Sequence, residues 1–218
     1  MQKPQNIFLK FIIPIIAVIV LLAVQALCDL ELPSYTSDII NNGIQQGGID
    51  SGLPEVLTSE IYNGIAKISK EDLPIMVSYD LFIPENLNSQ DLEALSEKYP
   101  LLKEENLYLL KDLTEEEKSI VEERIKIPLL ITTMLYSNNE DIAQNLNLTI
   151  PEGSTLLDVV LQLDDETFNT VINSIEQSLK SMDSMMLDQY AISSVKAIYN
   201  EIGMDMDKYQ ISYIMNKG

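Results

Sequence analysis

The sequence predicts an all-α protein with one N-terminal transmembrane helix followed by a mostly helical domain. Three observations lead to this prediction. The 218-residue chain contains one long apolar run, from Phe11 to Cys28. Its charges are divided unequally on the two sides of that run. Apolar residues in the last third of the chain recur at spacings of three and four, which is the period of an amphipathic helix.

The apolar run is long enough to cross a bilayer. It extends from Phe11 to Cys28 and is interrupted only by Pro14 and Gln25. Eighteen helical residues at about 1.5 Å each span roughly 27 Å. The preceding residues 7–9, with a snorkelling Lys10, complete the thickness of a hydrocarbon core. We therefore expect a transmembrane helix here.

The charge distribution sets the expected orientation of that helix. Residues 1–28 contain two lysines and no acid, whereas residues 29–218 contain 12 bases and 34 acids, a net charge of −22. Positive charge is retained on the cytoplasmic side of membranes. We therefore expect a plasma-membrane protein with a cytoplasmic N-terminus and with residues from about 29 onward outside the cell.

Two alternatives to a retained helix stay open. A cleaved signal peptide needs a shorter apolar core and a small-x-small cleavage site, and residues 25–29 offer none. A lipoprotein signal would make Cys28 the acylated residue, but Leu27 stands where that signal normally has a small residue. With the helix retained, Cys28 is a small apolar residue near the outer interface.

The composition excludes several classes of function. The chain has a net charge of −20 and no basic cluster longer than Arg124 and Lys126, so we expect no nucleic-acid partner. It contains no histidine, which removes imidazole ligands and Ser-His or Cys-His nucleophiles. Its single cysteine cannot form an intrachain disulfide.

The first half of the external region reads as short helices separated by prolines. Ser89 to Tyr99 is one such stretch, and the prolines that divide the region are Pro54, Pro74, Pro84 and Pro100. A capping box, Thr114 with Glu117, predicts a helix that runs toward Ile127. The apolar tract after Pro128, residues 129–136, is too short to cross a bilayer and is expected to be buried core rather than a membrane-surface contact.

The second half shows the clearest periodicity. A helix begun by Asp164 or Asp165 is predicted from one apolar stripe: Phe168, Val171, Ile172, Ile175, Leu179, Met182 and Met186. We interpret this Met-containing stripe as core packing, with a partner groove as the alternative. A second helix from about Ser184 is predicted to end at Gly203. Asp205 or Asp207 is expected to cap a third, and 146–150 is the one candidate strand.

Two acidic clusters, 164–166 and 205–207, invite comparison with metal sites. Neither is followed by the Gly and distant Glu of an EF-hand loop. Both coincide with predicted helix starts, where carboxylates cap free backbone N–H groups. We therefore expect no metal site, no catalytic residue and no cofactor site in this chain.

Two motifs in the N-terminal part resemble a known family. The apolar run leads into Asp29-Leu-Glu-Leu-Pro33 and then into Tyr35-Thr-Ser-Asp-Ile-Ile-Asn41-Asn-Gly43-Ile44. This segment, 25–50, resembles the first transmembrane helix of bacterial ATP-binding-cassette exporters. Residues 201–218 are similar to the tract that leads into the second transmembrane helix in exporters with a large extracellular insert. The resemblance covers about 1–52 and 183–218.

The resemblance implies a domain organisation. Residues 1–10 would be cytoplasmic, and 11–52 would form the first transmembrane helix and its extracellular extension. Residues 53–205 would form the acidic external domain, and 206–218 would lead into a second helix that lies beyond Gly218. Positions matching the family motif would have structural or translocation-path roles: Gln25, Asp29, Pro33, Tyr35, Asn41 and Gly43.

The resemblance also implies a function, transmembrane export of a lipid, peptide or drug-like substrate by an ATP-driven transporter. The chain has no phosphate loop, since it contains no Gly-Lys dipeptide, so ATP and Mg²⁺ would bind a nucleotide-binding domain absent from these residues. We therefore expect these residues to be the N-terminal portion of a longer subunit. This portion is not expected to be an enzyme by itself. Its partners would be the membrane, the remaining transporter helices and a second half-transporter, in a homo- or heterodimer. The alternative is a self-contained membrane-anchored extracellular binding protein, or a lipoprotein, with no transport role.

Overall fold

The computed structural model describes residues 46–137, 140–146 and 148–217, together with residues 18, 20–22, 25 and 40. The elements of the first half are β1 (Val56–Thr58), α2 (Ser59–Ile68), α3 (Leu73–Val77), β2 (Tyr79–Phe82), η2 (Pro84–Asn86), α4 (Ser89–Lys98), η3 (Pro100–Lys103) and β3 (Leu107–Leu110). Those of the second half are α5 (Glu115–Tyr136), α6 (Glu140–Asn145), α7 (Leu156–Leu161), α8 (Asp165–Lys180), α9 (Ser184–Ile202) and α10 (Met206–Lys217).

The fold is mostly helical, as predicted, but it is not all-α. Three short antiparallel strands form a sheet in the order β1-β3-β2, in which Tyr108 of the central strand lies opposite both Leu57 and Leu81. The candidate strand at 146–150 is wrong, because none of the described residues in that range is in a strand. The true strands have three or four residues each, too few to show an alternating pattern.

Helix α5 passes through the middle of the molecule. The predicted capping box is confirmed, since the Thr114 hydroxyl accepts from the Glu117 N–H and the Glu117 carboxylate accepts from the Thr114 N–H at 2.9 Å. The helix does not stop near Ile127 but continues past Pro128 to Tyr136. The prediction that 129–136 belongs to the core is confirmed at five positions: Leu129, Leu130, Ile131, Thr132 and Leu135 are buried.

Two adjoining apolar clusters form the core. The first gathers around the sheet, α2 and the last turns of α9, and includes Leu57, Ile61 and Tyr199. The second lies between α7, α8 and the end of α5, and includes Leu157 and Ile172. Helix α5 contributes to both, with Ile125 in the first cluster and Leu135 in the second. The two clusters are thus joined by shared helices rather than divided between separate lobes.

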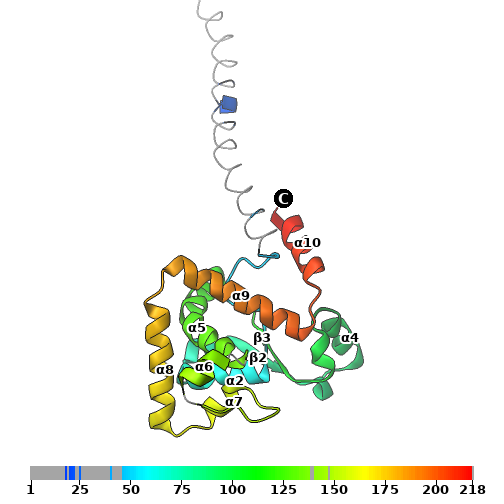
Figure 1. The fold of residues 1–218 in the computed structure, drawn as a ribbon. Helices are drawn as coiled ribbons and strands as arrows, with labels where there is room; N and C mark the ends of the chain where they lie inside the picture. Colours follow the sequence, from blue (N-terminus) through cyan, green and yellow to red (C-terminus); the bar gives the residue numbers. More distant parts are fainter. Residues whose placement is uncertain are drawn as a thin grey trace, which may run out of the picture.

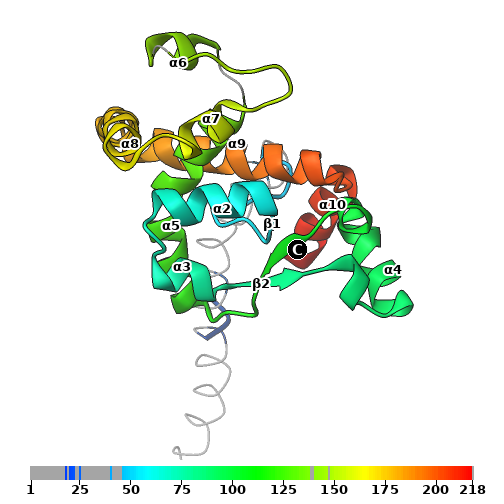
Figure 2. The ribbon, with the colours of Figure 1, turned by 90° about the horizontal axis from the view of Figure 1, so that it is seen from below.

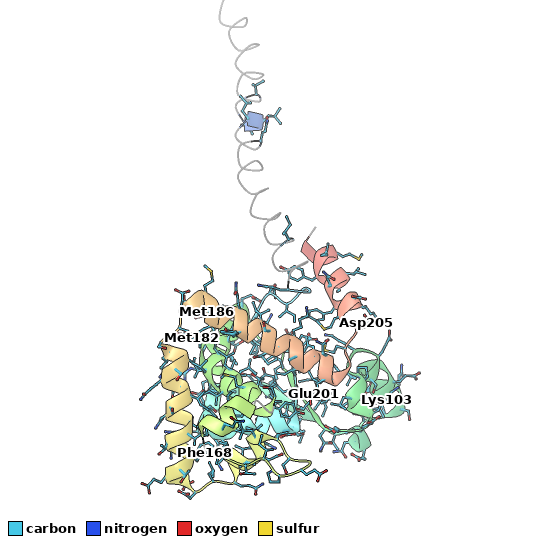
Figure 3. All side chains as sticks on the ribbon, viewed as in Figure 1. Lys103, Phe168, Met182, Met186, Glu201 and Asp205 are labelled. Carbon is cyan, nitrogen blue, oxygen red and sulfur yellow. The ribbon has the colours of Figure 1, made fainter. Side chains whose placement is uncertain are left out.

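Helix α8 confirms the predicted apolar stripe over most of its length. Asp164 is its N-cap, and its buried residues are Phe168, Val171, Ile172, Ile175 and Leu179. The prediction was wrong for the last two positions. The helix ends at Lys180, so Met182 lies in the corner before α9 and Met186 lies in the first turn of α9; their side chains are 36% and 47% exposed. Figure 3 labels both at that corner, at the opposite end of α8 from Phe168.

Helices α9 and α10 begin and end close to their predicted positions. Helix α9 ends at Gly203, whose left-handed φ of 81° is the expected glycine stop. Asp205 accepts a hydrogen bond from the Lys208 N–H at 3.0 Å and so begins α10. Figure 1 shows α9 lying across one side of the domain, with α8 descending from its start and α10 rising from its end.

The predicted transmembrane segment lies largely outside the described residues. Within it, residues 18, 20–22 and 25 are helical, and Val18, Val20, Leu21 and Leu22 are each more than half exposed. Among the helices formed by the described residues, none combines the length and apolar character needed to cross a membrane.

Candidate functional site

The first described residues of the domain pack against its last helix. A β-carbon at Gly48 would lie 3.0 Å from Cα of Gln210 and 3.0 Å from Cβ of Tyr213, so only glycine fits without displacing α10. The left-handed φ of 85° at Gly48 also favours glycine. Likewise, a β-carbon at Gly52 would lie 2.9 Å from the Ala191 β-carbon on α9. The start and the end of the domain are therefore side by side.

A cleft of about 530 Å³ opens next to this junction, between α4 and α10. Figure 2 shows these two helices as neighbours at one end of the domain. The cleft lining comes from three places: Gly48, Asp50 and Glu55 before β1; Ala94, Glu97 and Lys98 on α4; and Met204, Asp205, Lys208, Tyr209, Ser212 and Tyr213 at α10. The cleft is the leading candidate for a binding site in the described part of the chain.

The charges of the cleft are arranged in pairs with an excess of acid. Lys98 Nζ lies 3.0 Å from Glu55 Oε2, and Lys208 Nζ lies 2.8 Å from Glu97 Oε1. The lining contains four acids and two lysines, so Asp50 and Asp205 leave it net negative. Such a surface favours a cationic ligand over an anionic one.

Glu55 is held rigidly at the centre of this arrangement. Its backbone N–H donates to the Tyr199 hydroxyl at 2.8 Å, and its carbonyl accepts from the Leu110 N–H at 2.9 Å. The neighbouring Pro54 carbonyl accepts from the buried Tyr79 hydroxyl at 2.7 Å. The second carboxylate oxygen, Oε1, is shielded from solvent and has no hydrogen-bond partner among the described residues. The site therefore holds one unused acceptor.

Three ionisable groups of the cleft, Tyr209, Lys98 and Glu97, have pKa values shifted further from neutrality and so keep their usual charge states at pH 7. Burial, with the charge of Glu55, raises the pKa of Tyr209 to about 12. Burial alone would lower the pKa of Lys98, but its contacts with Tyr99 and Glu55 outweigh this and raise it. The bond to Lys208 lowers the pKa of Glu97. A general acid or base works best with a pKa near the working pH, so Tyr209 and Lys98 are suited to binding rather than proton transfer.

A second hollow adjoins the cleft. It measures about 450 Å³ and shares Asp50, Glu55, Lys98 and Tyr209 with the first. Residues 109–112, at and after the end of β3, form another part of its wall. Lys98 lies 5.0 Å from the centre of the Tyr99 ring, which adds a cation–π contact to the shared wall. A ligand extending from one hollow to the other would meet the Glu55–Lys98 pair.

None of the described residues that line this cleft belongs to the sequence motif. Gln25 is helical and exposed. Asp29, Pro33, Tyr35, Asn41 and Gly43 lie outside the described residues, so their expected structural or translocation-path roles stay predictions.

The acidic clusters have the capping role that their positions suggested. Asp164 accepts from the N–H groups of Glu166 and Thr167 at 3.1 and 3.0 Å. Asp205 caps α10. Across residues 46–137, 140–146 and 148–217, the structure contains no group of three or more His, Cys, Asp or Glu side chains arranged to hold a metal ion.

The sequence alone did not point to the cleft. Glu55, Lys98 and Tyr209 come from three distant segments, and none belongs to a recognisable motif. The local signal was the glycine pair Gly47–Gly48, since glycine is favoured where the backbone turns with a positive φ or approaches another backbone closely.

No protein-family model matches the chain, and no curated protein or solved structure is significantly similar to it.

Proposed function

We propose that the chain forms the first membrane-spanning helix and the external domain of an ATP-driven exporter subunit of the ATP-binding-cassette type. The observation that supports this most strongly is the contact between Gly48 and Gln210 on α10. A domain inserted between two neighbouring antiparallel membrane helices must leave and return at nearly the same place. The folded domain meets that requirement.

Two further features support the membrane part of the proposal. Val18, Val20, Leu21 and Leu22 are helical and exposed, although together with their neighbours they form the most apolar segment of the chain. A helix with apolar side chains on its surface needs an apolar environment, which a bilayer supplies. The family resemblance of residues 25–50 and 201–218 supplies the transport part.

In this proposal the external domain modulates export and does not drive it. Nucleotide hydrolysis belongs to a nucleotide-binding domain outside residues 1–218, with ATP and Mg²⁺ as its ligands. The resemblance points to a lipid, peptide or amphipathic drug as substrate. Purified residues 1–218 are expected to show no ATPase activity above background and no ATP-dependent change in melting temperature. Measurable ATP turnover would contradict this assignment.

The topology is tested by cysteine labelling in intact cells. Ser89 is exposed at the start of α4, so Ser89→Cys in a Cys28→Ala background should react with a membrane-impermeant thiol reagent. Gln5→Cys in the same background is the matched control and should react only after permeabilisation. The reverse pattern would place the domain in the cytoplasm and refute the proposal.

A second candidate function is a membrane-anchored binding protein without a transport role. The cleft between α4 and α10 favours it, since a preformed hollow of about 530 Å³ is large enough for a small ligand. The coding DNA beyond the Gly218 codon separates the two candidates. An apolar stretch of about 20 residues, followed by further spans and a phosphate loop, supports the exporter. An in-frame stop codon supports the anchored binding protein.

A further inference from the structure

The corner between α8 and α9 exposes four large, uncharged side chains within nine residues. Met182, Met185, Met186 and Tyr190 are 36%, 70%, 47% and 48% exposed. Exposed apolar groups that are gathered in one place, rather than scattered, commonly mark a contact surface. Methionine and tyrosine also suit an adaptable surface, because one is flexible and the other combines an apolar ring with a polar hydroxyl.

The exposed row of α9 extends this patch along the helix. Met186, Tyr190, Ser193, Ala197 and Asn200 recur at spacings of three and four, so they lie on one face, and all five are exposed. None of them is charged. In a region that carries a net charge of −22 from residue 29 onward, an exposed helix row without acids is unusual.

The charged residues of α9 are engaged elsewhere. Asp188 pairs with Lys126 on α5, and Glu201 accepts a hydrogen bond from the Tyr136 hydroxyl. Lys196 lies beside Gly47, at the start of the described domain. We call the surface formed by Met182, Met185 and the exposed row of α9 the α9 face. Asp188 and Glu201 are drawn toward α5, and the exposed N-cap Asp183 lies at the corner between Met182 and Met185, so the row from Met186 to Asn200 itself is neutral.

The α9 face lies on the side of the domain from which the chain continues. Figure 1 shows α10 rising from the end of α9, away from α5 and α8. Gly47 and Gly48, at the N-terminal end of the described domain, pack against Lys196 of α9 and Gln210 of α10. The apolar run Phe11–Cys28 is joined to the domain through this same junction. In the proposed anchor, a membrane entered by that run would face the side of the domain where Gly48 meets α10, next to α9.

We propose that the α9 face rests on the outer leaflet of the membrane, with Met185, Met186 and Tyr190 at the boundary between headgroups and acyl chains. This inference rests on the proposed membrane anchor. Acidic surfaces are repelled by anionic lipid headgroups, whereas a neutral row with Met and Tyr can approach them closely. The contact would fix the orientation of the domain, so the cleft between α4 and α10 would keep a constant position relative to the bilayer.

The test places a fluorescent probe on the α9 face. A chain of residues 1–218 with Cys28→Ala and Met185→Cys is labelled with an environment-sensitive fluorophore and reconstituted into phosphatidylcholine–phosphatidylglycerol vesicles. The matched control is Asn169→Cys, exposed on α8 and roughly 17 Å along that helix from Lys180, toward the end that points away from α9. Lipids spin-labelled near the headgroup are expected to quench the Met185→Cys probe at least about twofold more than the Asn169→Cys probe.

Each outcome leads to a different conclusion. Stronger quenching at Met185→Cys, reproduced by Tyr190→Cys, supports the membrane contact. Equal, weak quenching at both positions in protein that still sediments with vesicles overturns it and leaves the anchor intact. Shielding of the Met185→Cys probe that depends on protein density and not on the spin label indicates a second copy of the chain and also overturns it. If the chain fails to sediment with vesicles, both the anchor and this inference are refuted.

Discussion

The region around the sheet and the region around α8 are stabilised in different ways. Around the sheet, tyrosine hydroxyls reach backbone groups far away in the chain: Tyr79 bonds the Pro54 carbonyl, and Tyr199 accepts from the Glu55 N–H. Tyr62 and Tyr108 also stack with ring centres 3.6 Å apart. Around α8, an apolar face repeats every three or four residues and Asp164 caps its own helix. The first region depends on long-range polar contacts, and the second on local periodicity.

The largest loss of stability is expected when a charge is placed in the apolar face of α8. Ile175→Asp would bury a carboxylate in the second cluster with no basic partner within the stripe, and is expected to cost about 3 kcal/mol or more. Urea unfolding of residues 46–217, followed by circular dichroism, measures this loss. Asn173→Asp, on the exposed side of the same helix, is the matched control and should change stability by no more than about 0.5 kcal/mol. An Ile175→Asp variant that unfolds like the parent would show that this face is not core.

An intermediate effect is expected from removing one hydroxyl near the sheet. Tyr199→Phe keeps the buried ring but leaves the Glu55 N–H without its acceptor, which should cost about 1–3 kcal/mol. The same urea titration measures the change. Tyr190→Phe, which alters an exposed tyrosine on the same helix, should be close to neutral. If the two variants unfold alike, the long-range bond does not stabilise this region.

The smallest effect concerns the cap of α8 and its response to pH. The N–H and hydroxyl of Thr167 lower the pKa of the Asp164 carboxyl in the folded state. Its stabilising contribution is therefore present above the ordinary aspartate pKa of about 4 and is lost as the pH falls through the lower folded-state value. Asp164→Asn retains an uncharged cap, so its melting temperature should fall less than that of the parent between pH 5 and pH 2.5.

Thermal melting across that range, with Asp164→Ala as the variant lacking any cap, checks the prediction. The alanine variant should already melt lower at pH 7. Parallel pH profiles for the parent and Asp164→Asn would contradict a role for the carboxylate charge.

The same contrast explains which parts of the fold could be predicted from the sequence. The starts of α5, α8 and α10 were predicted because Thr114, Asp164 and Asp205 each bond a backbone N–H two or three residues away. The sheet was missed because β3 pairs with strands that are distant in the chain, and its four residues are all apolar or aromatic. Tertiary pairing selected the strand conformation there, and local pattern gave no sign of it.

Two errors have local causes that are visible only in the structure. Met182 and Met186 continue the spacing of the α8 stripe, but Asp183 accepts from the Met185 N–H and begins a new helix between them. Pro128 suggested a helix boundary, yet α5 continues because burial of Leu129, Leu130 and Leu135 outweighs the missing backbone bond. A capping aspartate was thus overlooked in one case, and a proline was given too much weight in the other.

The cleft could not be predicted for a different reason. Its chemistry arises when Glu55, Lys98 and Tyr209 meet, and each of these residues taken alone reads as an ordinary surface or core position. The pairing of Lys98 with Glu55, which sets the charge of the shared wall, depends on how α4 docks beside β1. Docking geometry of this kind is decided by the whole core.

The close contact of Gly48 with α10 links the folding of the domain to the distance between the two chain segments that flank it. When the domain is folded, residues 46 and 217 are held at a fixed separation; when it unfolds, the long intervening chain lets them drift apart. Linkage is reciprocal. A neighbouring structure that holds residues 46 and 217 close together stabilises the folded domain, and the folded domain stabilises that close spacing by the same free energy. Any movement that spreads the two flanking segments would therefore be opposed by the folding free energy of the domain.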